Sequence, residues 1–491
     1  MELAKRSIEA VGWNIGASLL TTAILFVRSV LLARWLRVET FGSYVLAGSL
    51  VSLTVVFVGF GMGAAFINRA SETEDEELTA SNHFTLKFIF ILIWAIAISI
   101  YALLFTRSNT QLALFVLIVT TSLIQLSQTP QLILTRRIKH QRLAANQVVV
   151  AILTTVVALF LAWNGYELWA LLATDIIVAL MTVFIFYIWR PVWRIRLAWA
   201  PPVIRYFLRM GSQTLPGTVL LQALDRIDDL WTGYFLGTTA LGYYSRSYKF
   251  ATYPRMILAQ PINNVATGTY AELKGQRLKL SQAFFRSNSL LVRVGFLFAG
   301  VLVLTAPEFI LLLLGEKWLP MVNIFRLMII YTLLDPIKLT VANLFLAVGD
   351  PKPVVKTRII QLCVMMIGLF TLGMTMGTIG VALTVDIMLF VGMVILFFRV
   401  RQYVDFSLRA MFMLPSIALI SAFLVGWFVA SYMLNDLSPW VVLFVKGLVF
   451  SCVYAGLLLL EKQNIKMLLR LLRYQTGNHI VRKDNQNPGD F

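Results

Sequence analysis

The feature that most constrains this chain is the recurrence of apolar runs, each long enough to cross a bilayer as a helix. A helical crossing needs about 20 apolar residues, and hydrocarbon forces every backbone N–H and C=O to be paired inside the protein. Of the 491 residues, 59% are hydrophobic and only 13% are charged, which is too much apolar surface for a water-soluble chain to bury. The sequence therefore predicts an all-α, polytopic membrane protein.

Fourteen spans are expected from these runs. They cover residues 7–33, 41–66, 84–105, 111–132, 145–163, 168–189, 212–236, 241–268, 286–305, 321–348, 359–375, 378–398, 411–433 and 438–460. Because the number is even, both termini lie on the same side of the membrane.

Lys and Arg are distributed very unevenly between the two sets of loops, and this predicts the orientation. The termini and the loops on their side hold 27 of the 42 basic residues, whereas the opposite loops hold only Arg34, Arg37, Arg107 and Lys317. Both termini are therefore expected in the cytoplasm. The net charge of +18 then belongs mostly to a cytoplasmic face that meets anionic membrane lipids, and a nucleic-acid site is not indicated.

Apart from Glu9 at the start of the first span, seventeen charged residues remain inside the spans, eleven of them basic and six acidic. Each costs roughly 2.5–3.5 kcal/mol at a helix centre, so such groups should face a water-filled cavity or one another. Some have simple structural explanations, because Asp335 and Lys338 are three positions apart on one helix and can pair. The deeper basic residues have no acidic residue three or four positions away and are expected to line one cavity: Arg28, Arg246, Lys249, Arg255 and Arg293.

The stretch QALDRIDDLWTGYFLG at 222–237 concentrates four charges in one span. On a helix Arg226 and Asp229 share a face, which predicts an ion pair that partly offsets their burial. Asp228 is expected to point into the cavity. We predict that Arg226 joins the substrate-binding residues and that Asp225, Asp228 and Asp229 are candidates for binding a coupling ion.

An internal repeat divides the chain. LRVETFGSY at 36–44 and LGTTALGYY at 236–244 align at an offset of 200, and six spans separate them, so both copies have the same orientation. This indicates a parallel repeat of two six-helix lobes about an axis normal to the membrane. The expected parts are an N-lobe (1–189), a cytoplasmic basic linker (190–211), a C-lobe (212–403), two extra spans (404–460) and a cytoplasmic tail (461–491).

Four stretches together resemble a known family: VRSVLLARWLRVETFGSYVLAGSL, DDLWTGYFLGTTALGYYSRSYKFATYP, LLLLGEKWLPMVNIFRLM and NLFLAVGDPKPVVK. The chain is similar, over roughly residues 5–460, to the polysaccharide-transport (Wzx-like, colanic-acid exporter-like) flippases of the multidrug/oligosaccharidyl-lipid/polysaccharide exporter superfamily. The resemblance implies a bacterial inner-membrane protein that moves an undecaprenyl-diphosphate-linked oligosaccharide to the periplasmic leaflet. The resemblance also implies two lobes that enclose a cationic central cavity. The family's arginine in the first helix falls on Arg28, and its Asp-Gly-Leu-Gly pattern falls on Asp228, Gly233, Leu236 and Gly237. The chain departs from the pattern by flanking Asp228 with three further charges.

The predicted mechanism needs no covalent chemistry, so no enzyme activity, catalytic residue, metal or cofactor is expected. No phosphate-binding loop of the form GxxxxGK[ST] occurs, so an H⁺ or Na⁺ gradient is the expected energy source. The polysaccharide polymerase machinery is a further expected partner. Two alternatives stay open: a multidrug or other small-molecule exporter of the same superfamily, which the excess of basic residues disfavours, and a membrane-embedded glycan polymerase or ligase, which the short outer loops disfavour.

Overall fold

The computed structural model describes residues 20–459 except 69–75, 107, 137–139, 190, 192 and 434–436. Most of these residues are helical, the longest non-helical segment lies between η1 and α10, and none of them forms a strand, which confirms the all-α fold class. Arg107, the middle of the basic loop RRIKHQR and the tail at 461–491 lie outside the described residues, as do both termini.

The helices follow one another through short connections. After a helix over residues 20–35 they are α2 (Val38–Thr54), α3 (Val56–Gly59), α4 (Met62–Asn68), α5 (Glu76–Phe105), α6 (Ser108–Leu126), α7 (Gln128–Arg136), α8 (His140–Trp163), α9 (Glu167–Val183), α10 (Pro201–Phe235), α11 (Thr238–Pro254), α12 (Gln260–Glu272), α13 (Arg277–Leu304), α14 (Ala306–Leu314), α15 (Val322–Val348), α16 (Lys352–Gly368), α17 (Met374–Val400), α18 (Leu408–Met433) and α19 (Pro439–Leu459). Short π- or 3₁₀-helical turns extend or join them at η1 (Phe184–Ile188), η2 (Arg255–Ala259), η3 (Glu316–Met321) and η4 (Leu369–Gly373).

Among the described residues, nine helical stretches are long and apolar enough to cross a membrane. One of them, Lys352–Val400, has 49 residues, which is enough for two crossings, since about 20 residues suffice for one. Three long stretches are not among the nine: α8, whose apolar part is the shorter Val148–Trp163, α10, and the continuous helix formed by α11, η2 and α12. The last two carry seven of the charged residues that the sequence places at membrane depth, so they are less apolar than most of the other helices. The multi-pass membrane fold is therefore confirmed, whereas the number fourteen stays a prediction.

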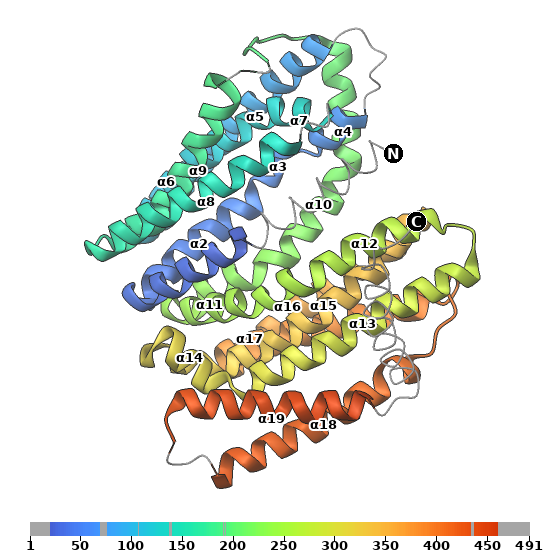
Figure 1. The fold of residues 1–491 in the computed structure, drawn as a ribbon. Coiled ribbons are helices and arrows are strands. Elements are labelled where there is room, and N and C mark those ends of the chain that lie inside the picture. Colours follow the sequence, from blue (N-terminus) through green and yellow to red (C-terminus); the bar gives the residue numbers. More distant parts are fainter. Residues whose placement is uncertain are drawn as a thin grey trace, which may run out of the picture.

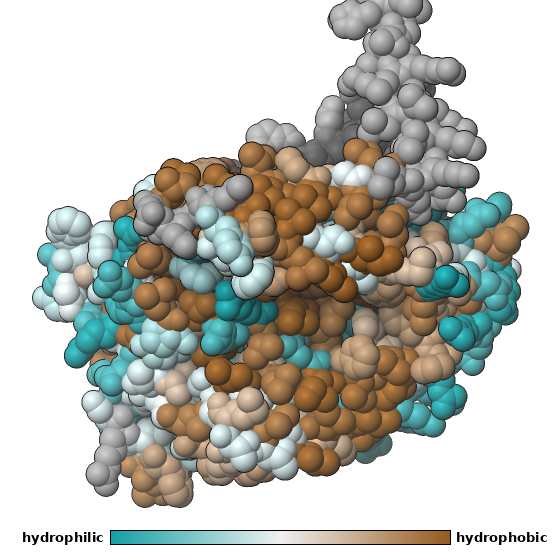
Figure 2. Space-filling view, turned by 90° about the horizontal axis from the view of Figure 1, so that it is seen from below, coloured by the Kyte–Doolittle hydropathy of each residue, from teal (hydrophilic) through white to brown (hydrophobic). Residues whose placement is uncertain are grey.

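The helices form two groups (Figure 1). The first group contains the helices from α2 to α9, the second contains those from α12 to α17, and α2 packs along α11 where the groups meet. Helices α18 and α19 pack on each other and against α13, on the side of the second group that faces away from the first. On that side, apolar side chains cover most of the surface and hydrophilic ones gather mainly toward its left and right ends (Figure 2).

Helix α10 belongs to both groups. Its N-terminal part buries Val203, Ile204 and Phe207 in a core shared with α4 and α5, and its C-terminal part contacts α2, α11 and α16. Because α10 begins at Pro201, residues 201–211 of the predicted linker continue directly into the following span. Proline fits at a helix start because its missing N–H would have no partner there.

Candidate functional site

The two copies of the repeat pack against each other where α2 crosses α11. A Cβ on Gly42 would overlap the backbone oxygen of Thr238, and a Cβ on Gly242 would overlap that of Val38. Thr239 donates a hydrogen bond to Glu39 over 3.1 Å. At the offset of 200 the first two contacts are counterparts of each other and the third joins equivalent positions, as a two-fold relation between the copies requires. The glycines are needed here because the two backbones touch.

Four basic side chains lie together close to this crossing, and we call them the cationic cluster. They come from the helix over residues 20–35, from α10 and from α11: Arg28, Arg226, Arg246 and Lys249. The other three all lie near enough to Lys249 to repel its charge. The structure therefore brings together four of the six predicted substrate-binding residues.

The protein gives the cationic cluster few partners. Arg28 donates to the hydroxyl of Thr154 over 3.0 Å, and the guanidinium of Arg246 lies 4.3 Å from the ring centroid of Phe41. The Nε atom of Arg246 is buried and has no hydrogen-bond partner among the described residues. Because a guanidinium carries five N–H donors, most of its capacity to bind an anion is left unused.

Carboxylates surround the cluster and are held mainly by hydroxyl groups. Tyr44 donates to Asp175 over 2.7 Å, and Tyr244 donates to Asp228 over 2.5 Å. The two tyrosines are equivalent in the repeat, so each copy fixes one carboxylate in the same way. The sequence analysis assigned no role to Asp175. The match of Tyr44 with Tyr244 in the repeat was the one sequence signal related to it, because each tyrosine binds a carboxylate.

The predicted pair within the DRIDD stretch forms. Arg226 lies 3.5 Å from Asp229, and Asp229 also accepts a hydrogen bond from Ser49 of α2 over 3.0 Å. Asp228 is held instead by its tyrosine, and its second oxygen is buried without a hydrogen-bond partner among the described residues. The two neighbouring carboxylates therefore have different surroundings.

A second group of charges lies between η2 and α15. Asp335 accepts from Arg255 over 2.7 Å and from Lys338 over 3.1 Å. Asp225 is near enough to Asp335 and Arg226 to interact with both, so it lies between this group and the cationic cluster. Arg255, which has no acidic partner in its own span, thus finds one on α15.

Arg293 occupies a different place from the other predicted site residues. It lies on α13 beside α19, where the hydroxyl of Tyr454 donates to its backbone oxygen over 2.9 Å. That Arg293 lines one cavity together with Arg28, Arg246 and Lys249 stays a prediction. The described residues hold no group of three His, Cys, Asp or Glu that could bind a metal ion.

Reciprocal hydrogen bonds join the C-terminal end of the helix over residues 20–35 to η3 and α14, and we call them the outer latch. Lys317 donates to the backbone oxygens of Arg34 and Leu36 over 2.8 Å each, and Trp318 donates to that of Ala33 over 2.9 Å. In return, Arg34 donates to the backbone oxygen of Leu313 over 2.7 Å. Lys317 thus binds carbonyl groups at the C-terminal end of the helix over residues 20–35, and Arg34 binds one at the C-terminal end of α14.

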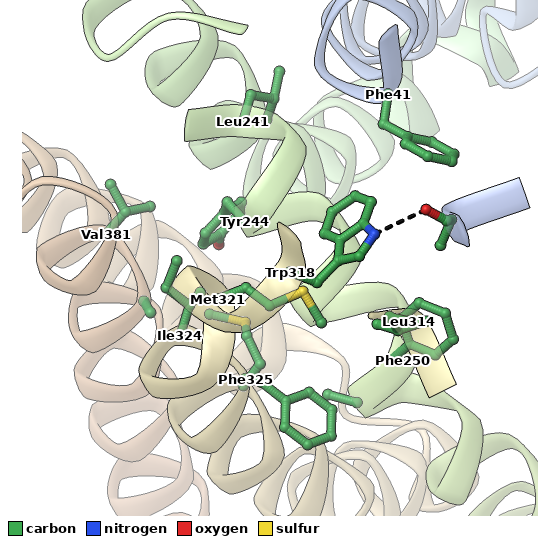
Figure 3. Close-up of a cluster of buried hydrophobic side chains, with 14 of the residues drawn as sticks. Phe41, Leu241, Tyr244, Phe250, Leu314, Trp318, Met321, Ile324, Phe325 and Val381 are labelled. Carbon is green, nitrogen blue, oxygen red and sulfur yellow. Dashed lines mark hydrogen bonds between the residues drawn. The ribbon is translucent and has the colours of Figure 1, made fainter. Parts of the chain in front are cut away.

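The indole of Trp318 anchors the latch. It is fully buried and lies between Phe41 and Met321 in a cluster built from both groups of helices (Figure 3), where the dashed line marks its bond to Ala33. Nearby, Arg37 donates to both carboxylate oxygens of Glu167, and these hydrogen bonds raise the pKa of Arg37 above its ordinary value. The sequence pattern placed Arg34 and Lys317 in outer loops but did not indicate that they meet.

The sequence matches the family described as polysaccharide biosynthesis protein over residues 31–323. It is 24% identical to the succinoglycan biosynthesis transport protein ExoT of Rhizobium meliloti (strain 1021) over 323 residues, covering 64% of this chain and 64% of that relative, which is just under two thirds. It is 22% identical to the teichuronic acid biosynthesis protein TuaB of Bacillus subtilis (71% and 72% covered). It is 21% identical to the lipopolysaccharide biosynthesis protein WzxC of Escherichia coli (78% of each covered).

Two solved structures have the same fold. The lipid II flippase MurJ, in an inward closed conformation, superposes with a TM-score of 0.74 at 15% identity and covers 93% of this chain and 99% of its own. An inward-facing multidrug resistance transporter of the MATE family superposes with a TM-score of 0.61 at 16% identity, covering 78% of this chain and 95% of its own.

Proposed function

Because this chain belongs to the polysaccharide biosynthesis protein family, we propose that it is a flippase of the bacterial inner membrane. Its substrate is an undecaprenyl-diphosphate-linked oligosaccharide, which it moves from the cytoplasmic to the periplasmic leaflet. The names of ExoT as a transport protein and of MurJ as a lipid II flippase support this assignment. The observation that carries it is the cationic cluster, in which Arg28, Arg246 and Lys249 form no ion pair with another described residue.

The chemistry of the cluster suits a diphosphate. Guanidinium groups bind phosphate oxygens through paired hydrogen bonds, and such charge-assisted bonds are among the strongest in proteins. Arg28 and Arg246 carry the donors for this contact, while Lys249 adds a mobile point charge. The prenyl tail stays in the bilayer, so the protein only has to shelter the headgroup that hydrocarbon rejects.

Movement of the headgroup follows from alternating access between two lobes. We propose that these are the N-lobe (1–189) and the C-lobe (212–403), that residues 404–460 add two helices outside them, and that both termini are cytoplasmic. The α2–α11 crossing and the outer latch then close the periplasmic side. Opening that side requires the latch to break, after which the headgroup can leave outward.

Energy for the cycle comes from an ion gradient in this proposal. Asp228 is the first candidate for binding H⁺ or Na⁺, because one of its oxygens has no hydrogen-bond partner among the described residues, and Asp225 and Asp229 are further candidates. No step requires covalent catalysis by the protein. The polysaccharide polymerase machinery would take up the flipped substrate.

The proposal is tested in liposomes that contain the purified protein and a fluorescent lipid-diphosphate oligosaccharide, with and without imposed H⁺ and Na⁺ gradients. Arg246→Gln should reduce flipping at least ten-fold. Arg326→Gln is the matched control, because Arg326 also lies at membrane depth but donates its hydrogen bonds to Val303 and Asn323, away from the cluster. Wild-type flipping by Arg246→Gln would overturn the role of the cluster, and export of cationic drugs without lipid flipping would favour the multidrug alternative.

A further inference from the structure

An apolar groove runs between helices of the second group and the α18–α19 hairpin. Its volume is about 600 Å³. It is lined by Phe296 of α13, Leu334 of α15, Val394, Phe397 and Phe398 of α17, and Phe412 and Met413 of α18, among others. Volumes of 300–1,000 Å³ are typical of sites that hold a small molecule or part of a larger one. We call this site the α17–α18 groove.

One end of the groove is basic. A second cavity of about 490 Å³ adjoins it and shares Arg401, Leu408 and Arg409 with it, while Ser407 contributes a hydroxyl. Arg401 lies 5.8 Å from the ring centroids of both Phe398 and Phe406. Among the described residues, neither Arg401 nor Arg409 forms an ion pair.

The carboxylate beside the two arginines is already engaged. Arg277 donates to both oxygens of Asp405 over 2.7 and 2.8 Å, and these hydrogen bonds lower the pKa of Asp405 below its ordinary value. Asp405 therefore stays charged and bound to Arg277. Arg401 and Arg409 line both cavities, and Arg409 donates only to the sulfur of Met413, over 3.3 Å, among the described residues.

An apolar groove with two such guanidinium groups at one end fits an amphiphile with an anionic headgroup. By the distribution of basic residues, the loop at 401–407 faces the cytoplasm, and basic pockets between helices on that side bind anionic lipid headgroups. We propose that the α17–α18 groove binds an anionic phospholipid of the cytoplasmic leaflet, with its phosphate between Arg401 and Arg409 and one acyl chain along the apolar lining. This site is additional to the one for the transported substrate.

The lining residues separate the groove from the cationic cluster. All of them come from α13, α15, α17, α18 and the loop that joins the last two. None comes from the helix over residues 20–35, α2, α10 or α11, which hold the cluster and the crossing. The phosphate site proposed at Arg401 and Arg409 therefore uses none of the residues of the cationic cluster, and the test below distinguishes a phospholipid from the prenyl tail of the substrate.

The test is equilibrium binding to the purified full-length protein in detergent, followed by native mass spectrometry. Phosphatidylglycerol is compared with phosphatidylcholine of the same chains and with undecaprenyl phosphate. Each basic residue near a lipid surface is worth about five-fold in affinity for an anionic lipid. The double variant Arg401→Gln, Arg409→Gln should therefore bind phosphatidylglycerol roughly 30-fold more weakly, and phosphatidylcholine unchanged.

Two further variants make the result specific. Lys352→Gln with Lys356→Gln removes two exposed charges from the start of α16, away from the groove, and should leave binding unchanged. Val394→Trp fills the apolar part and should weaken phosphatidylglycerol binding while the arginines remain. Equal wild-type affinity for the two phospholipids would overturn the proposal. So would undecaprenyl phosphate binding more tightly than phosphatidylglycerol and losing that affinity in the arginine variant.

Phospholipid binding in the groove and flipping of the substrate can be tested separately. Arg246→Gln removes a charge from the cationic cluster and should leave phosphatidylglycerol binding at the wild-type level. If that variant instead lost phospholipid binding and flipping together, the two sites would be one.

Discussion

At the scale of single residues, the acidic and basic groups of the site are compensated in different ways. Carboxylates receive hydroxyl hydrogen bonds, from Tyr44 to Asp175 and from Tyr244 to Asp228. Arg28 donates to one hydroxyl and Arg246 lies against an aromatic face, whereas Arg226 pairs with Asp229. The Nε atom of Arg246 has no hydrogen-bond partner among the described residues. A site of this kind is ready for an anion, because the anion supplies the hydrogen bonds that the protein withholds.

The Arg226–Asp229 pair leads to a stability prediction. Removing one member of a buried ion pair leaves an unpaired charge, but the Arg226 side chain is 41% exposed and water screens part of the loss. Arg226→Ala should therefore lower the free energy of unfolding by about 1–2 kcal/mol, and Arg226→Ala with Asp229→Ala should recover most of it. Unfolding in detergent measures both. If the double variant is as unstable as Arg226→Ala, Arg226 does not stabilise the protein through its ion pair with Asp229.

Asp228 gives a prediction about transport. Asp228→Asn keeps an acceptor for the hydroxyl of Tyr244 but removes the charge, so the protein should fold and insert normally. Its flipping should fall at least ten-fold or lose its dependence on the ion gradient. Tyr244→Phe is the contrasting variant, because it keeps the charge and removes only the hydrogen bond. Wild-type, gradient-dependent flipping by Asp228→Asn would exclude this carboxylate from coupling.

Which contacts the sequence could predict depends on their distance along the chain. The pairs Arg226–Asp229 and Asp335–Lys338 are three positions apart, so helical periodicity alone predicts them. Arg255 meets Asp335 only because η2 packs near α15, and Tyr44 meets Asp175 only because α2 packs against α9. Such contacts depend on how helices pack, which no local pattern in one sequence contains.

At the scale of elements, the α2–α11 crossing requires small residues. Helix α2 offers a matched pair of glycines, because Gly42 touches the backbone of α11 whereas Gly48 has open space around it. Gly42→Ala should cost about 1–3 kcal/mol, since the added methyl group forces the two helices apart. Gly48→Ala should be neutral or slightly stabilising, because alanine has a higher helix propensity than glycine. Thermal unfolding in detergent compares the two, and equal effects would contradict the close contact.

The sequence indicated the repeat, but it did not indicate that the two copies pack against each other. Three identities in nine residues suggested two equivalent segments, and the structure places them in contact with each other. The outer latch had no such signal, because Arg34, Lys317 and Trp318 bind backbone oxygens, which every residue possesses. Contacts to the backbone leave no pattern of complementary side chains to recognise.

At the scale of the whole molecule, the α2–α11 crossing and the outer latch hold distant parts of the chain together. The fold class followed from hydrophobic length alone, since a bilayer allows few alternatives. The packing of α18 and α19 on α13 agrees with two helices added outside the repeat, and this division stays a proposal. If the chain works by the alternating access proposed above, one sequence encodes both a closed and an open packing, and no sequence pattern indicates which of them the structure represents.

A reversible cross-link across the crossing tests whether α2 and α11 must separate during transport. The side chains of Glu39 and Thr239 are joined by a hydrogen bond of 3.1 Å. Because cysteine is shorter than glutamate, Glu39→Cys with Thr239→Cys is joined by a short bis-methanethiosulfonate reagent, in a background where Cys363 and Cys452 are replaced by serine. The cross-link should stop flipping, and a reductant should restore it. The control is Arg37→Cys with Glu167→Cys, joined by the same reagent within the first group, where the native side chains are 3.0 Å apart, and it should leave flipping intact. Full activity of the protein cross-linked between α2 and α11 would exclude a cycle in which this crossing opens, because the short cross-link keeps the two helices together in every state.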